Sequence, residues 1–475
     1  MARKRRIFIL LGVNKNQKET KMRRKAEAVL GFESSDRGMP KIVRQHRDKY
    51  RRISQVLDRH LEVLEAAAAD LAVLSAPGNK GREADFTAEN LLRALIVMSR
   101  QGLTFRETVL LIADNGFLQD FVRLRKKPVM DFTTLDKASL AIRPETWKSL
   151  NEALGLDAAK AKQIDPDVIR VDTTVIESNV HYPTDCSLAW DAWRTAERLL
   201  EQAREIAPEL VPHRFQGKKV KKLFIFTTRY AASKDQKRRR EVKRQMGVLL
   251  KRTSWIVEIA AAFCEKATKS LDFVLSAIAD ELAGHLPVMR KILDTARRAQ
   301  LEGEKVPAAE RAFSLFEPHT ELIKRGRREK PVEFGHKFLL CQTAEKFITD
   351  YEVLETQTAD CNLTETVVER HKELFGKPPK VLSGDKGFRP DEATFEDLEE
   401  EVETLAIPHR LRDFADKVMV MWQAFRAGIE GTISCLKRAF RLSRCFFKGF
   451  KGFARGVGLQ VFTHNLMILA DLDGG

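Results

Sequence analysis

The sequence lacks the features of a secreted, membrane-spanning or thiolate-metal protein. No stretch approaches the ~18 consecutive apolar residues of a transmembrane helix. The apolar run at residues 7–13 follows a basic segment but has no small-residue cleavage site, so it is not predicted to be a signal peptide. The six cysteines form no CxxC pair and lie at no zinc-ligand spacing to histidine, which predicts reduced thiols. We expect a cytoplasmic protein with no membrane partner.

The chain instead carries a large excess of positive charge. Its 83 Lys and Arg against 67 Asp and Glu give a net charge of +16 and an isoelectric point near 9.5. This balance favours a polyanionic partner, and nucleic acid is the better prediction because nothing in the sequence anchors to lipid. At 475 residues the chain exceeds the ~250–300 at which one core stops growing, so several domains are expected.

The N-terminal part is predicted to be helical. Residues 1–80 comprise a basic arm followed by a helix, and residues 81–160 contain three short helices joined by tight turns. Thr87 and Thr104 are placed to cap the first two of these helices, and Gly102 to end the first. The spacing is compatible with a helix-turn-helix-like DNA-binding domain, and an ordinary helical bundle fits it equally well.

A strand is predicted next, over residues 167–177. Its β-branched residues alternate with Arg170, Asp172 and Thr174, so a carboxylate lies in the middle of the strand and needs a partner or a metal ion. Residues 189–330 then form a mainly helical insertion. Its most basic stretch, residues 234–244, carries seven cations and two acids, which indicates a solvated helix face or a contact with a phosphate backbone.

Strand character returns after the insertion. Residues 334–342 and 347–356 are predicted to form two adjacent strands, followed by a helix over 364–375 that Thr364 would cap. A short strand at 380–383 leads to Asp385, which has a glycine on each side that permits close approach of the backbone to a ligand.

The C-terminal part consists of a last strand and two helices. The strand is predicted over residues 403–408, and the final helix over 457–472. Between them, the helix over 418–440 places Arg426, Glu430 and Lys437 in one narrow stripe. Such a triplet is also explained by simple ion pairing on a helix surface.

The order of these elements resembles that of a ribonuclease H-like fold, in which carboxylates from the first strand, the fourth strand and the last helix converge on two divalent ions. The corresponding residues are Asp172, Asp385 and Glu430. Hard oxygen ligands of this kind bind Mg²⁺, and Mn²⁺ is the expected substitute. Two ions can stabilise the attacking and leaving oxygens of a phosphoryl transfer. Glu177 and Asp185 are rival acids, ranked lower because Glu177 has the opposite strand parity and Asp185 lies beyond a proline.

Four stretches are similar to DDE transposases of bacterial insertion sequences, in particular the ISNCY-like branch. These stretches are VDTTVIESNVHYPTD at 171–185, GHKF at 335–338, SGDKGF at 383–388 and RAGIEGTISCLKR at 426–438. The family's third-carboxylate signature, Tyr-x2-Arg-x3-Glu-x6-Lys, is matched at Arg426, Glu430 and Lys437, whereas Gln423 stands at the tyrosine position.

The resemblance implies an α/β protein with a ribonuclease H-like mixed-sheet core over residues 161–188 and 331–475. It implies a transposase that cuts element ends and joins them to target DNA with two Mg²⁺ ions. Its partners would be the terminal inverted repeats and target DNA, bound by a homodimer. The residues expected to contact DNA are Arg426, Lys437, His181 and Lys386. Two alternatives stay open: a nuclease of this fold without strand transfer, and a catalytically silent DNA-binding protein descended from a transposase.

Overall fold

The structure is a computed structural model that describes seven segments of the chain: residue 25 and residues 35–74, 85–124, 127–267, 272–325, 331–409 and 417–474. Most of the predicted basic arm lies outside the described residues. The chain divides into two compact units. Unit 1 comprises residues 1–154 and 462–475, and unit 2 comprises residues 155–461. None of the helices in these segments is both long enough and apolar enough to cross a membrane.

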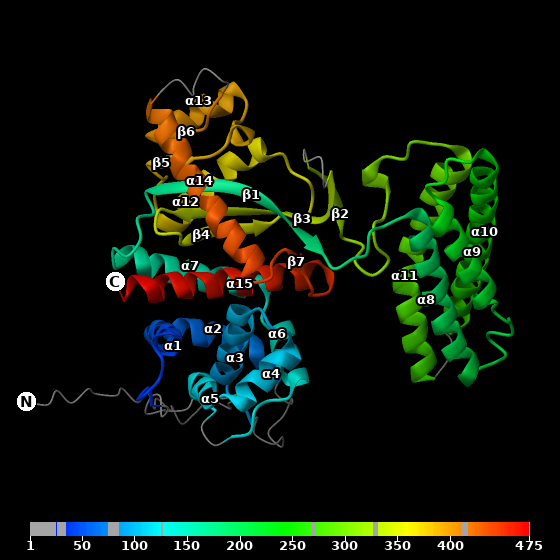
Figure 1. Cartoon of the computed structure of the whole chain (residues 1–475), viewed down its shortest axis with the longest axis horizontal. Coiled ribbons are helices and arrows are strands. Elements are labelled where there is room, and N and C mark those ends of the chain that lie inside the picture. Colours follow the sequence, from blue (N-terminus) through cyan, green and yellow to red (C-terminus); the bar gives the residue numbers. More distant parts are fainter. Residues whose placement is uncertain are drawn as a thin grey trace, which may run out of the picture. The chain divides into compact units, whose positions relative to one another are not determined.

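Unit 1 is built from short helices, coloured blue to cyan in Figure 1. The predicted caps are confirmed: Thr87 and Thr104 each form a capping box, with Asn90 and Glu107 respectively. Gly102 ends the first of these helices in the left-handed conformation. The helices are α1 (Lys41–Arg59), α2 (Leu61–Leu71), α3 (Ala88–Gln101), α4 (Phe105–Asp114), α5 (Gly116–Val122), α6 (Phe132–Ala141), the first part of α7 (Pro144–Lys160) and, in red, the last part of α15 (Gly449–Leu472).

Helix α3 forms the centre of unit 1, and it contains a buried charge. The Arg93 side chain is fully buried and donates to Glu89 at 2.9 Å and to Asp58 at 2.7 Å. Since a buried charge is tolerated only with partners, this ion-pair group helps to fix α3 against α1. Residues 88–99 of α3 are all buried, so α3 has no free face for a DNA groove.

Unit 2 contains a mixed sheet of seven strands, which follow the order β2-β3-β1-β5-β6, with β4 also paired to β3 and β7 to β1. The long central strand β1 runs antiparallel to β3 and parallel to β5, and β5 runs parallel to β6. The predicted pair of adjacent strands is confirmed as antiparallel β3 and β4. The strands are β1 (Val168–Ser178), β2 (Glu321–Lys324), β3 (Val332–Thr343), β4 (Ile348–Val353), β5 (Val381–Ser383), β6 (Thr404–Ala406) and β7 (Arg444–Cys445).

The two faces of β1 meet different helices. Ile169 and Val171 belong to a hydrophobic core with side chains of α12 (Thr364–Phe375) and α13 (Glu392–Glu401). Alternation along the strand turns Arg170 and Asp172 to the opposite face, where α14 (Lys417–Arg438) packs. There the Arg170 guanidinium donates to the Phe425 carbonyl at 2.7 Å.

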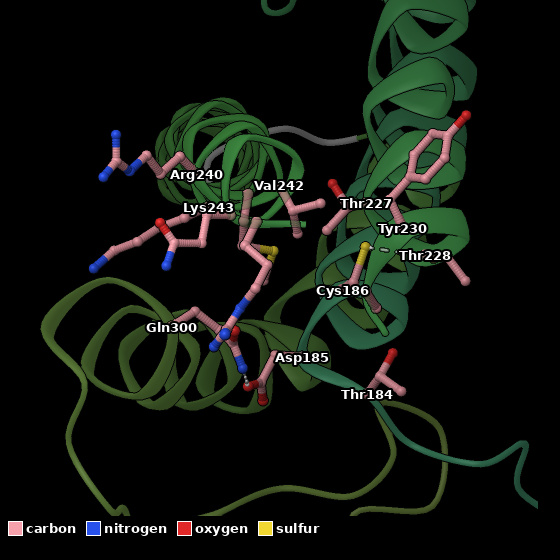
Figure 2. Close-up of a pocket in the computed structure, with 14 residues that line it drawn as sticks. Thr184, Asp185, Cys186, Thr227, Thr228, Tyr230, Arg240, Val242, Lys243 and Gln300 are labelled. Carbon is pink, nitrogen blue, oxygen red and sulfur yellow. Dashed lines mark hydrogen bonds between the residues drawn. The ribbon is translucent and has the colours of Figure 1, made fainter. Parts of the chain in front are cut away.

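Four helices follow β1 before the sheet resumes, and they pack on one another around their own apolar core. They are α8 (Asp185–Ile206), α9 (Gly217–Tyr230), α10 (Gln236–Ala267) and α11 (Phe273–Arg297), shown in green in Figure 1. The π-helical turn η2 (Arg298–Glu302) continues α11. A cavity of about 760 Å³ opens where the start of α8, the end of α9 and the start of α10 meet η2 (Figure 2).

Three of the local predictions were wrong. Residues 87–142 contain four helices in their described part, α3 to α6, where three were expected. Thr364 is the first residue of α12 and does not cap it; its hydroxyl donates instead to the Phe388 carbonyl and so ties α12 to the segment after Asp385. The final helix, α15 (Gly449–Leu472), begins before residue 457. Phe450 and Phe453, which the sequence placed ahead of this helix, lie in its first turns and contact His336.

Candidate acidic site

The register of the sheet brings two of the predicted carboxylates side by side. Ser383 at the end of β5 pairs with Arg170 in β1, and the two strands are parallel. Continuing this register by two residues places Asp385 beside Asp172. Asp385 caps the short helix η5 (Lys386–Phe388), where its carboxylate accepts from the Gly387 amide at 2.7 Å. Pairing of the main chain in β1 and β5 positions Asp172, and capping of η5 positions Asp385.

The Asp172 carboxyl has an unusual electrostatic environment. Burial raises its pKa to about 6, against the opposing effects of the Arg426 guanidinium and of the Thr173 amide. The negative charges of Asp385 and Asp360 raise the pKa further. Because like charges gathered at one place favour the binding of a cation, this carboxyl belongs to a group that attracts positive charge.

Helix α14 brings the third predicted carboxylate to the same face of the sheet. Arg426 donates to Asp172 at 3.2 Å and to Glu430 at 3.1 Å, so one guanidinium joins a carboxylate of β1 to a carboxylate of α14. The Arg426 side chain is mostly buried, whereas that of Glu430 is 65% exposed. The expected stripe on α14 is therefore present, and its arginine contacts the acids directly.

The residue at the family's tyrosine position has a structural role here. The Gln423 side-chain amide donates to the carbonyls of Gly384 at 3.0 Å and Ala406 at 3.1 Å. These carbonyls follow β5 and end β6, so Gln423 fixes α14 against the ends of both strands. The Ser383 hydroxyl adds a bond to the Trp422 carbonyl at 3.0 Å. A side chain other than tyrosine thus holds α14 in place.

Sequence reasoning missed a fourth acid, Asp360, in the 3-10 turn η4 (Asp360–Leu363) before α12. Its carboxylate accepts from the Thr173 hydroxyl at 3.0 Å and from the Lys337 ammonium at 2.9 Å. Lys337 belongs to the GHKF stretch of the sequence. Because β3 pairs with β1, Lys337 lies near Asp360, and the sequence alone does not indicate this pairing.

The other residues predicted to contact DNA lie in different surroundings. Lys386 is exposed in η5, directly after Asp385, and Lys437 is partly buried near the end of α14. His181 lies in the loop after β1, with its Nε2 3.5 Å from the Asp191 carboxylate. The DNA contacts of Arg426, Lys437, His181 and Lys386 stay predictions.

The two rival acids are engaged away from the acidic group. Glu177 pairs with Arg444 at 2.9 Å, and Asp185 pairs with Arg311 at 2.9 Å. Each of these carboxylates therefore has a cationic partner other than Arg426 within unit 2.

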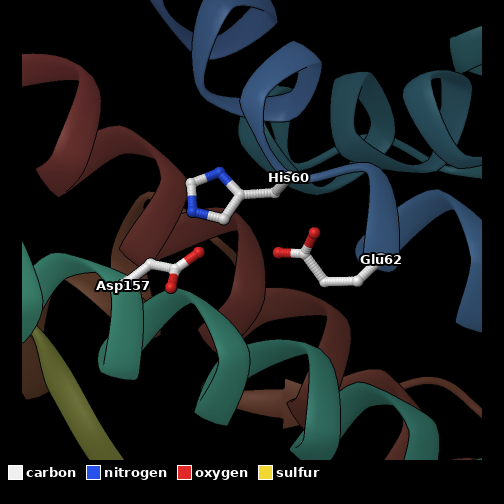
Figure 3. Close-up of side chains that lie close together, drawn as sticks. All are labelled: His60, Glu62 and Asp157. Carbon is white, nitrogen blue, oxygen red and sulfur yellow. The ribbon is translucent and has the colours of Figure 1, made fainter.

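The side-chain oxygens of Asp172, Asp385 and Glu430 do not all lie within 4.8 Å of one another. Among the described residues, the only three side chains that do are His60, Glu62 and Asp157 (Figure 3). His60 and Glu62 belong to unit 1 and Asp157 to unit 2, so we assign no metal site to them.

The histidine of the GHKF stretch belongs to a buried hydrogen-bonded chain. His336 is fully buried; its Nδ1 lies 2.9 Å from the Leu354 carbonyl, and its Nε2 lies 2.7 Å from Nδ1 of His319. Because a carbonyl only accepts, Nδ1 of His336 must carry the proton and Nε2 must accept from His319. The chain continues from His319 Nε2 to the Glu317 carboxylate at 2.8 Å. Burial, and then the charge of His319, lower the pKa of His336 to about 4.

Comparison of the chain with protein-family models, with curated proteins and with solved structures gives no match. Two features of the chain therefore bear on its function: the arrangement of the acidic group, and the resemblance of four sequence stretches to DDE transposases.

Proposed function

We propose that the protein is a DNA transposase with a ribonuclease H-like core that transfers phosphoryl groups with two divalent ions. The observation that carries the proposal is the position of Asp172 in β1 and of Asp385 two residues after the parallel strand β5, together with α14, whose Arg426 joins Asp172 to Glu430. The resemblance likewise expects one acid in a first strand, one at the end of a later strand and one in a late helix.

The residues present fit divalent ions of the Mg²⁺ type. All the donors are carboxylate oxygens, which such ions prefer. Burial is the main cause of the raised pKa of Asp172, and the negative charges of Asp385 and Asp360 add to it. Two ions in such sites lie about 3.5–4 Å apart, so the three carboxylates need not all reach one ion. When bound, the ions would activate the attacking oxygen and stabilise the leaving one. Asp172, Asp385 and Glu430 would hold them, and the carboxylate of Asp360 adds negative charge near Asp172.

Arg426 would have two alternative partners. Without a competing cation it neutralises Asp172 and Glu430, and a guanidinium of this kind binds phosphate equally well through paired N–H donors. Repulsion by a bound cation would turn it toward the DNA phosphate, the contact expected from the sequence. Lys437 would hold an adjacent phosphate, and the metal ions would be left to the carboxylates.

One observation favours a second candidate, the catalytically silent DNA-binding protein. Arg426 already supplies positive charge to two of the three acids, and a fixed arginine would make a metal ion unnecessary. The two candidates differ in whether Arg426 yields its place to Mg²⁺.

The proposal is tested with purified protein and a linear DNA that carries the gene with its own flanking sequence, searched beforehand for inverted repeats. With Mg²⁺, the wild type should cut at the ends of the repeats and join the freed 3′ ends to a second DNA. Cleavage without joining would identify the nuclease alternative, and binding without cleavage would identify the silent protein.

Variants show whether the acids carry the reaction. Asp172→Asn, Asp385→Asn and Glu430→Gln should each abolish cleavage and leave DNA binding largely intact. Asp397→Asn, which removes an exposed acid from α13, is the matched control and should cut at the wild-type rate. Cleavage at an undiminished rate by one of the first three variants removes that residue from the site.

A further inference from the structure

The cavity shown in Figure 2 lies in the helical bundle, outside the acidic group. Its wall includes one edge of α10, from which the Arg240 and Lys243 side chains extend toward the same side of the view, and Arg239 also lines it. The rest of the lining includes Asp185, Cys186, Thr227, Thr228 and Gln300.

Three cations of α10 line the cavity: Arg239, Arg240 and Lys243. Within the described ranges, these three form no salt bridge and their side chains are exposed. The next cation along the helix, Arg244, does not line the cavity and pairs with Glu241 at 2.7 Å. The edge of the cavity therefore carries three positive charges that no described acid pairs with.

The opposite wall does not neutralise them. Asp185 is the only acid in the lining, and its carboxylate accepts from Arg311 at 2.9 Å and from Gln300 at 2.7 Å. Burial raises the pKa of the Cys186 thiol, so the floor offers no thiolate to a cation or a metal. The hydroxyls of Thr227 and Thr228 in the lining donate to the Leu223 carbonyl and to Cys186 Sγ. The cavity thus has a positive edge and an acid that is already paired.

We propose that this cavity binds phosphate groups. Arginine forks and an ammonium group are groups that proteins use to hold phosphate oxygens, and the cavity edge supplies both. From Arg239 to Lys243 the helix rises about 6 Å, close to the length over which one DNA strand carries two charges. The phosphates can come from a DNA backbone or from a free phosphate compound, and only the first source depends on the proposed function.

The test compares two double variants of the full-length protein. Arg240→Ala with Lys243→Ala removes two charges from the cavity edge, and Lys234→Ala with Lys237→Ala removes two exposed charges of the same basic stretch that do not line the cavity. All four side chains are exposed, so both variants should fold, which thermal unfolding followed by circular dichroism checks. Metal-free buffer keeps the acidic group out of the comparison.

Two measurements distinguish the sources of phosphate. Calorimetric titration with pyrophosphate should detect binding to the wild type and the control, with at least a tenfold loss for the cavity variant. The affinity for a duplex DNA, measured against salt, should show a slope reduced by about 2 for the cavity variant, and by less than half of that for the control. If only pyrophosphate binding changes, the site serves a free phosphate compound.

The proposal is overturned if the cavity variant and the control behave alike in both measurements. It is also overturned if an acidic polypeptide, poly-glutamate, competes as well as pyrophosphate, because the cavity would then recognise negative charge without preference for phosphate. Neither measurement involves cleavage or strand transfer, so a protein that lacks both activities can still have this site. Failure of this proposal and failure of the proposed function are thereby separated.

Discussion

The buried His336 should make the sheet of unit 2 sensitive to mild acid. Its Nε2 accepts a hydrogen bond from Nδ1 of His319, and its Nδ1 donates one to the Leu354 carbonyl, so a proton added to Nε2 breaks the chain. A histidine with a lowered pKa in the folded state takes up protons on unfolding. The stability that it contributes is present above pH 6.5 and is lost as the pH falls toward 4.

The size of the loss follows from the pKa. A fall from 6.5 to about 4 corresponds to about 3 kcal/mol in the free energy of unfolding when both states are fully titrated, and to about 2 kcal/mol at pH 5. Asp172, with its raised pKa, acts in the opposite direction. A comparison with a variant at His336 removes such contributions, because they are the same in both proteins.

The assay is hydrogen exchange of the β3 amides at increasing urea concentration, which reports the opening of the sheet. Between pH 7.5 and pH 5 the wild type should lose about 2 kcal/mol more than His336→Gln loses. The control His213→Gln, at an exposed histidine in the loop between α8 and α9, should keep the wild-type pH dependence. Equal losses for the wild type and His336→Gln would refute the reasoning.

Three further predictions concern packing and charge. Gly335→Ala should destabilise unit 2 by about 2 kcal/mol or more in urea unfolding, because its Cβ would lie 2.0 Å from the Ile176 carbonyl oxygen. The control Gly284→Ala, which has open space around the new Cβ, should stabilise its helix by about 0.5–1 kcal/mol. Arg426→Gln should increase the thermal stabilisation given by Mn²⁺, as a competing cation is removed, and an unchanged or smaller shift would count against that competition. Arg93→Met should weaken unit 1 by about 3 kcal/mol or more, measured by exchange in α3, since it leaves a buried acid with fewer partners.

Local rules predicted those parts of the fold that depend on neighbours in sequence. The capping of α3 by Thr87 and of α4 by Thr104 follows from a side chain that meets an amide three residues on. The strand around Asp172 follows from alternation of apolar and polar residues. Thr364 fails as a cap because a long-range bond to Phe388 takes its hydroxyl, which no local pattern indicates.

The candidate site could be predicted only in part, for the same reason. The order of the elements brought Asp172, Asp385 and Glu430 into one group, but it did not indicate that Arg426 would join two of them. Asp360 lies in a turn with no repeating pattern, and its relation to the group depends on contacts with β1 and β3. Which side chains meet across a sheet depends on the order of the strands. The periodicity of the sequence indicates strands but not their order.

The central claim of the proposal is that Asp172 in β1, Asp385 after β5 and Glu430 in α14 form a divalent-ion site. Its most direct test is the electron paramagnetic resonance signal of Mn²⁺ titrated into the wild type, Asp172→Asn, Asp385→Asn and the control Asp397→Asn. We predict bound Mn²⁺ in the wild type and the control, and a loss of at least one bound ion in both Asp172→Asn and Asp385→Asn. Equal amounts of bound Mn²⁺ in all four proteins, or none in the wild type, would contradict the claim.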